Sequence, residues 1–255
     1  MKIRSKLFIT YTVVALIPII ALSSLLYYKI KSSILSYTIE ELKLAAELKV
    51  DAIESYFNNF KTDIIIAQSY LNIQMNMPKL IFFQNDAKNP VYQDALKKLD
   101  SQYIPYYKEK GLIAFILLDI EKKIVYTADK RHREVETGRN ITSVYPVKDL
   151  NSLNNNDVWL SDVFMHDNRI ELLIFNHLYN NLDGKLLGYV VFGINMENIN
   201  SLLRNKTGLG STGETVVGIK DGDEALFISP DFGGKTAKLK KSKLKLVKSS
   251  LVVPS

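Results

Sequence analysis

The chain contains no cysteine, so several kinds of chemistry are excluded at once. A disulfide scaffold, a thiolate-held zinc or iron–sulfur site and a thiol nucleophile all need that side chain. Glycine and proline are also scarce, with 12 and 7 among 255 residues, while 47% of the residues are hydrophobic. This composition excludes collagen-like and disordered chains, and the length suffices for one large domain or two small ones.

Charge is missing from residues 7–28, and this absence is the strongest signal in the sequence. A helix of these 22 residues is about 33 Å long, which matches the hydrocarbon core of a bilayer. Three basic residues in the preceding segment 1–6 predict a cytoplasmic N-terminus. We therefore expect a single-pass anchor in the cell (inner) membrane, with a periplasmic or extracellular remainder. A cleaved signal peptide is the alternative, because Ala21–Ser23 is a suitable cleavage context.

The net charge of +6 comes from the two ends of the chain. Seven lysines lie between Lys235 and Lys248, and no acidic residue balances them. A basic end is not a basic binding face, so we expect no nucleic-acid partner. The tail at 231–255 is predicted to be disordered. Two explanations stay open: a receptor gene interrupted near residue 230, or a native tail that binds acidic polymers or anionic lipid headgroups.

Residues 29–72 predict a long amphipathic helix that leaves the membrane. Apolar residues recur at intervals that are sums of three and four, with charged residues at most other positions. The apolar positions are Ile39, Leu42, Ala46, Ile53, Phe57, Phe60, Ile64, Ala67 and Leu71. We expect this stripe, from 39 to 71, to pack on its own domain and to pair with a second copy in a homodimer.

From residue 111 onward the pattern is mostly that of strands. The apolar run at 112–120 and a partner at 123–127 flank the turn Glu121-Lys122-Lys123. Further strands are predicted at Val158–Met165, Ile170–Leu178 and Gly188–Met196. Helices followed by an antiparallel meander define an α+β fold rather than a doubly wound sheet.

Three segments have a familiar order: LIAFILLDIEKKIVYTAD at 112–129, DGKLLGYVVFGINMENINSLL at 183–203 and TGETVVGIKDGD at 212–223. The chain resembles the extracytoplasmic Cache sensor region of bacterial transmembrane receptors, such as sensor histidine kinases, chemoreceptors and diguanylate cyclases. The resemblance implies a PAS-like antiparallel-sheet sensor domain at 73–205 and the start of a second, truncated sheet domain at 206–230.

The function that this resemblance implies is extracytoplasmic ligand sensing for a transmembrane signal-transduction receptor. The chain then stops before a second membrane span and an output domain, so no output enzyme is expected in it. The alternative is a membrane-anchored binding or dimerisation module that acts in trans on a full-length receptor.

A glycine-rich match to GxGxxG at 208–213 does not indicate a nucleotide site. A predicted helix precedes it and a strand follows, the reverse of the dinucleotide-binding order, and Glu214 stands where a phosphate-binding loop needs lysine. The three histidines lack the spacing of a helical metal site. No nucleophile-elbow pattern surrounds Ser161. We therefore expect no catalytic residues, no metal and no cofactor.

A sensor sheet needs a half-apolar pocket with a few convergent polar groups. The candidates are Tyr126, Arg139, Trp159, Asp162, Phe164, His166, Asn176 and Asn195. Trp159, the only tryptophan, is equally suited to a core position. Asn176 interrupts an apolar run, so its amide must find a hydrogen-bond partner in a ligand or in the protein.

The resemblance also bears on the class of small-molecule ligand. Cache sensors of amino acids typically carry Arg-x-Trp-Tyr, then Tyr-x-Asp, then an aspartate at the end of a strand. This chain has no Arg-x-Trp-Tyr, and it has Phe164, His166 and Asn195 at the later positions. An α-amino acid ligand is therefore disfavoured, and carboxylates, purines, polyamines or no ligand stay open.

Overall fold

A computed structural model describes residues 3–147, 150, 158–166, 169–205, 209, 215, 217–221, 224–229 and 238–243. The chain divides into two compact units: Met1–Val50 with Lys206–Glu214, and Asp51–Asn205 with Thr215–Ser255. The glycine-rich run at 208–213 lies outside the described residues except for Leu209, and so does the end of the basic tail at 244–255.

Helix α1 runs without interruption from Ile3 to Gln68. Within the part of this helix from Tyr11 to Gln68, an 18-residue window has a mean hydropathy of 2.0, and none of that window is buried by protein. Among the described residues it is the one helix long and apolar enough to cross a membrane. Pro18 lies inside the helix, and the hydroxyl of Ser24 donates to the carbonyl of Ile20 at 2.8 Å. Side chains this apolar and uncovered fit the anchor predicted at 7–28.

The end of α1 belongs to the second unit and enters its core. Phe60, Ile64 and Ala67 are buried there, on the face that the periodicity predicted. The helix ends at Gln68, and Leu71 begins the next helix, so the predicted stripe stops one turn early. The hydroxyl of Ser69 donates to the carbonyl of Ile66 at 2.8 Å and competes with the helical pattern at this point.

Two helices complete this layer. Helix α2 spans Leu71–Phe82 and α3 spans Pro90–Glu109. Asn89 caps α3 by accepting a hydrogen bond from the backbone of Val91, and Pro90 occupies the first turn, where its missing N–H costs nothing. The two helices bury an apolar face that consists of Ile73, Met77, Leu80, Tyr92, Ala95, Leu99 and Tyr103.

The main sheet is antiparallel, as the sequence predicted. Its order is β2-β1-β6-β5-β3, with β4 also paired to β5. The strands are β1 (Ala114–Leu118), β2 (Ile124–Thr127), β3 (Trp159–Leu160), β4 (Phe164–His166), β5 (Arg169–Tyr179) and β6 (Leu186–Asn195). Gly188 lets β6 approach β1, because a Cβ at this position would lie 1.9 Å from the carbonyl oxygen of Leu118.

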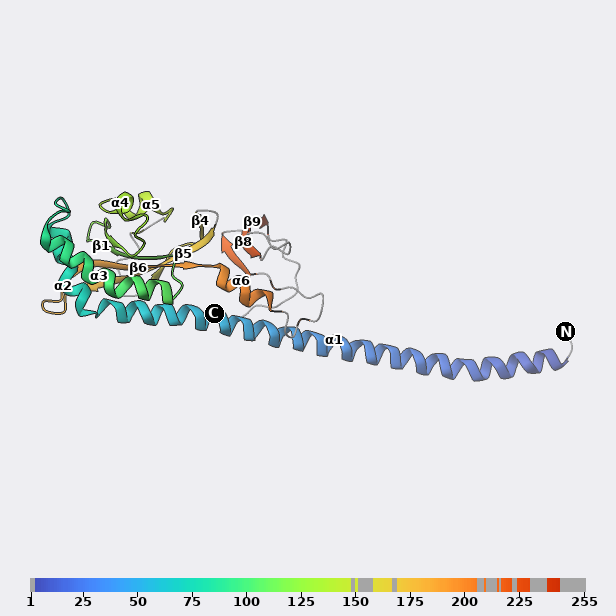
Figure 1. Ribbon diagram of the computed structural model, residues 1–255. Coiled ribbons are helices and arrows are strands. Elements are labelled where there is room, and N and C mark those ends of the chain that lie inside the picture. Colours follow the sequence, from blue (N-terminus) through green and yellow to red (C-terminus); the bar gives the residue numbers. More distant parts are fainter. Residues whose placement is uncertain are drawn as a thin grey trace. The chain divides into compact units, whose positions relative to one another are not determined.

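Both faces of this sheet are covered, and successive residues of each strand alternate between them. The face toward α1, α2 and α3 carries Phe115, Leu117, Ile174, Val190 and Phe192. The other face carries Ile116, Leu118, Leu173, Phe175 and Val191. Two one-turn helices, α4 (Arg133–Glu136) and α5 (Ile141–Val144), lie over that second face (Figure 1). The result is a mixed α/β, PAS-like arrangement.

Helix α6 (Glu197–Arg204) follows β6 and buries Ile199 and Leu203. A second antiparallel sheet has the order β7-β8-β9, with β7 at Val217–Asp221, β8 at Glu224–Ser229 and β9 at Lys238–Lys243. Strand β9 lies inside the tail for which composition predicted disorder. This lysine-rich segment pairs with β8 through the backbone, with Phe227 opposite Lys240. The lysine composition does not indicate a strand, because backbone pairing does not depend on it.

Candidate ligand-binding site

A cluster of polar side chains, buried except for the partly exposed His166, lies under α4 and α5. Glu136 comes from α4, Tyr145 follows α5, His166 ends β4 and Glu171 lies near the start of β5. Glu136, Tyr145 and Glu171 are 7%, 6% and 3% exposed. Ionisable groups are rarely buried to this extent unless a partner or a function requires it.

The cluster is held together by short contacts around the histidine. The Nδ1 atom of His166 lies 3.2 Å from Oε2 of Glu171. The ring centroid of Tyr145 lies 5.0 Å from that of His166 and 6.3 Å from that of Phe164. In the β5–β6 register Glu171 stands opposite Asn195. The Glu171 carboxylate therefore lies between positions 166 and 195, the two positions at which amino-acid sensors typically carry aspartate.

Burial dominates the electrostatics of this cluster. Burial raises the pKa of the Glu136 carboxyl, and Asp129 raises it further, while His132, His166 and Arg139 lower it. Burial also raises the pKa of Tyr145, and the carboxylates of Glu136, Glu171 and Asp129 add to the effect. A buried site with several carboxylates near one phenol favours a bound cation, because the cation offsets the cost of desolvating negative charge.

Three of the predicted site residues lie on this face of the sheet. Phe164 and His166 belong to the cluster itself. Trp159 lies farther along the same face, opposite Phe175 in the β3–β5 register, and the two ring centroids are 5.1 Å apart. Arg139 and Asp162 are exposed, although Arg139 is close enough to influence Glu136.

Tyr126 and Asn176 lie on the opposite face, toward the long helices. The hydroxyl of Tyr126 donates to Asp100 on α3 at 3.2 Å. The amide of Asn176 donates to the side chain of Gln68 at 3.1 Å and to the carbonyl of Ile64 at 3.5 Å, so its partner is α1. Asn195 accepts a hydrogen bond from the backbone of Glu197 at the start of α6. The eight candidates therefore do not form a single site.

Sequence reasoning missed Glu136, Tyr145 and Glu171. Glu171 carries a usable signal, since a charged residue inside the strand RIELLIFNHLY is unusual where the nine residues from Ile170 to Leu178 are all buried. Glu136 has no such signal, because the sequence REVE of α4 has the composition of a solvated turn.

No protein-family model and no curated protein sequence matches the chain, whereas solved structures do. The ligand-binding domain of the Campylobacter jejuni chemoreceptor Tlp3, in complex with L-norvaline, is 13% identical, covers 75% of this chain and 84% of its own, and has a TM-score of 0.44. That of the Pseudomonas fluorescens chemoreceptor CtaA, with L-serine, is 13% identical and covers 76% and 72% at a TM-score of 0.48. The sensor domain of the Vibrio cholerae histidine kinase DctB is 11% identical and covers 73% and 88% at 0.37.

These structures are ligand-binding or sensor domains of chemoreceptors and of a histidine kinase, which are receptor classes that the sequence resemblance named. None of the three is a catalytic domain.

The prediction that disfavoured an α-amino acid ligand was wrong. Tlp3 and CtaA were solved with L-norvaline and L-serine, and a further Tlp3 structure holds isoleucine. The prediction assumed that a missing motif meant missing carboxylates. The fold supplies Glu171 and Glu136 from other elements, and the premise therefore fails.

Proposed function

We propose that this chain is the extracytoplasmic ligand-sensing part of a transmembrane receptor, anchored at 7–28 with a cytoplasmic N-terminus. The buried cluster of Glu136, Tyr145, His166 and Glu171 is the observation that carries this proposal. It lies on one face of a sheet whose other face packs against α1, the helix that also contains the membrane-length apolar segment. The sensor domains among the matching structures support the same role without catalysis.

The ligand is a small molecule with a protonated amine, α-amino acids included. An ammonium group has three N–H donors, and Glu136, Glu171 and the oxygen of Tyr145 offer acceptors for them. Phe164, opposite Glu171 in the β4–β5 register, provides apolar surface beside the acidic groups for the rest of the ligand. The chemistry of the cluster and the amino acids bound by Tlp3 and CtaA support the same class.

Binding can reach α1 through the sheet. Strand β5 carries Glu171 toward the ligand side and Asn176 toward α1, where its amide contacts Gln68. A ligand that binds one arrangement of β5 more tightly than another shifts the population toward that arrangement. The packing of the last turns of α1 then changes with the population.

The test uses the full chain in detergent and a panel of ethanolamine, putrescine, L-alanine, L-serine and L-norvaline, with succinate and adenine as controls. We expect at least one amine to raise the melting temperature of the wild type. Glu171→Gln should abolish the rise because the amide carries no charge. The matched variant Glu121→Gln, whose carboxylate forms a surface ion pair with Lys123, should keep it. An amine response that survives in Glu171→Gln would contradict the proposal.

A module acting in trans is the second candidate, and one observation favours it. Ile39, Leu42 and Val50 lie beyond the predicted anchor on one side of α1, and all three are large exposed apolar side chains. Such a stripe fits a second helix of the same kind, from another copy or from a full-length receptor.

A further inference from the structure

Asp100 and Arg133 form a two-pronged ion pair between α3 and α4. Arg133 Nη1 donates to Asp100 Oδ2 at 3.0 Å, and Nη2 donates to Oδ1 of the same carboxylate. The side chains are 16% and 14% exposed. Paired, partly buried charges in this geometry are among the stronger polar contacts in proteins.

The remaining donor of Arg133 is also used. Its Nε donates to the carbonyl of Thr127 at 3.0 Å, and Nη2 donates to the same oxygen at 2.8 Å. The guanidinium lies 5.0 Å from the ring centroid of Tyr126, whose hydroxyl donates to Asp100. Arg133 is thereby fixed to the end of the edge strand β2 and to α3 at once.

This ion pair joins the two layers that cover opposite faces of the sheet. Asp100 lies on α3, in the helical layer, and Arg133 begins α4, which covers the candidate ligand site. Helix α4 is a single turn, closed by the backbone hydrogen bond from Thr137 to Arg133 at 2.9 Å. Glu136 is therefore one turn away from the ion pair, on an element too short to be stable by itself.

We propose that the Asp100–Arg133 pair is a clamp that positions the carboxylate of Glu136 in the ligand site. Arg133 and Asp100 are positioning residues, and neither contacts the ligand. The effect of the clamp on ligand binding rests on the proposed function. Its effect on the position of Glu136 depends only on the contacts of α4.

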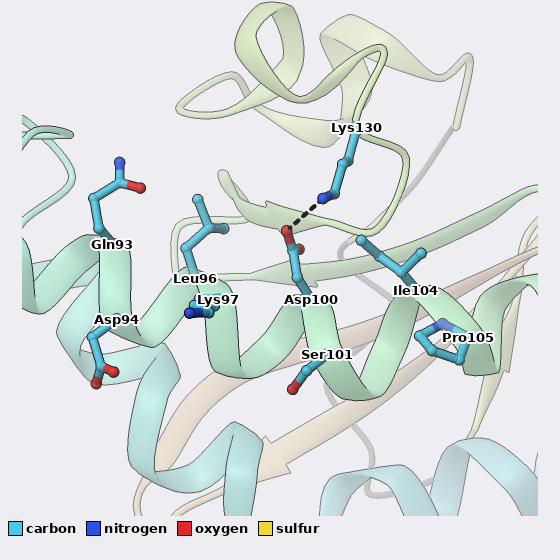
Figure 2. A pocket seen from close by; sticks show the side chains of 9 residues that line it. All are labelled: Gln93, Asp94, Leu96, Lys97, Asp100, Ser101, Ile104, Pro105 and Lys130. Carbon is cyan, nitrogen blue, oxygen red and sulfur yellow. Dashed lines mark ion pairs between the residues drawn. The ribbon is translucent and has the colours of Figure 1, made fainter.

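The outer side of Asp100 borders an open groove of about 690 Å³ along α3. Figure 2 shows Asp100 pointing toward Lys130, at 3.4 Å, whereas Asp94 lies on the other side of the helix. Asp94 pairs only with exposed Lys98 among the described residues. An Asp→Asn substitution at either position therefore removes one charge from α3. Only the substitution at Asp100 also removes the clamp.

The test compares Asp100→Asn with Asp94→Asn in the full chain in detergent. Asparagine preserves the size of the side chain and its bond to Tyr126, so the fold should be kept. We expect exchange of the backbone amides of Glu136 and Thr137 to become faster by about tenfold or more in Asp100→Asn, as expected for loss of a charged hydrogen-bonded pair, and to be unchanged in Asp94→Asn. Arg133→Lys, which keeps the charge but loses the two-pronged contact, should fall between them.

A second readout follows the carboxyl carbon of Glu136 by NMR in protein labelled at glutamate, assigned by its loss in Glu136→Gln. Its wild-type pKa should be raised by burial, under the influence of Asp129, His132, His166, Arg139 and Tyr145. In Asp100→Asn it should move toward the ordinary glutamate value, because a released α4 exposes the carboxyl. Equal amide exchange and an unchanged pKa in the two variants would overturn the clamp.

The third readout is the affinity for whichever panel amine stabilises the wild type. We expect Asp100→Asn to weaken it about tenfold and Asp94→Asn to leave it unchanged. Faster exchange in α4 with unchanged affinity would show a clamp that does not position the ligand carboxylate, and would overturn the inference. If no amine binds the wild type, the proposed function fails, while the exchange and pKa readouts still decide the clamp.

Discussion

The seating of α1 against the sheet leads to a sharp stability prediction. Ile64 is completely buried, whereas Ile65, its neighbour in the same helix, is 48% exposed. Changing each in turn to alanine makes the same chemical change at a buried and at an exposed position of the helix. The gain in helix propensity is a few tenths of a kcal/mol at both positions and cancels in the comparison.

The expected magnitudes differ several-fold. Removing a buried isoleucine side chain destabilises by about 2–5 kcal/mol, because transfer free energy is lost and a cavity remains. Ile64 touches the cluster that contains Phe115, Phe192 and Met77, which are themselves fully buried and cannot easily close the gap. Ile65→Ala should change the stability by about 0.5 kcal/mol or less. For a unit of this size the loss at Ile64 corresponds to a fall in melting temperature of roughly 4 to 20 °C.

Fluorescence of Trp159 provides the assay. It is the only tryptophan, and it lies on the sheet face away from α1, so neither substitution perturbs it directly. Thermal unfolding of the full chain in detergent should show one transition that shifts in Ile64→Ala and stays in place in Ile65→Ala. Equal shifts in the two variants would refute the orientation of α1, and with it the route from β5 to the membrane helix.

Two further predictions concern the acidic cluster and α1. Because the folded-state pKa of Glu136 is raised, its contribution to stability is complete below the ordinary glutamate pKa and is lost as the pH rises through the folded pKa. Glu136→Gln should therefore melt higher than the wild type near pH 7 and lose that advantage toward pH 4, whereas a constant difference would contradict the burial argument. Ile39→Asp with Leu42→Asp should abolish self-association in detergent, measured by light scattering, while Ser36→Asp should not. The buried Phe60 is unsuitable for this test, since its change would unfold the domain, and a dimer that persisted in the double variant would exclude the stripe as its interface.

Strand positions and the two hairpins could be predicted from the sequence because they depend on local patterns. The predicted meander was wrong, because β1 pairs with the distant strand β6. The partner strand predicted at 123–127 corresponds to β2, and the strands predicted at 170–178 and 188–196 correspond to β5 and β6. The strand predicted at 158–165 is instead divided into β3 and β4. Its break comes at Ser161, whose hydroxyl accepts the backbone N–H of Leu173. Here a side-chain hydroxyl takes the place of a backbone acceptor in the sheet. Such a substitution between residues far apart in the chain leaves no periodic pattern in the sequence.

The faces of β5 could not be predicted, and the candidate site was divided between them for this reason. Alternation identifies a face only where one side of a sheet meets water. Strand β5 is buried on both sides, so the sequence does not show that Phe175 and Asn176 point to opposite layers. The side of each residue became clear only from the contacts with α1.

The error about the ligand has a different physical origin. A motif records the positions at which relatives place a charge, whereas a ligand responds to the field that all nearby groups produce together. His166 and Asn195 lack that charge, yet Glu171 lies 3.2 Å from the first and pairs in register with the second. Glu136 adds another carboxylate from a turn that no strand pattern includes. The missing motif excludes carboxylates at two positions, and an ammonium group in the site would still meet negative charge.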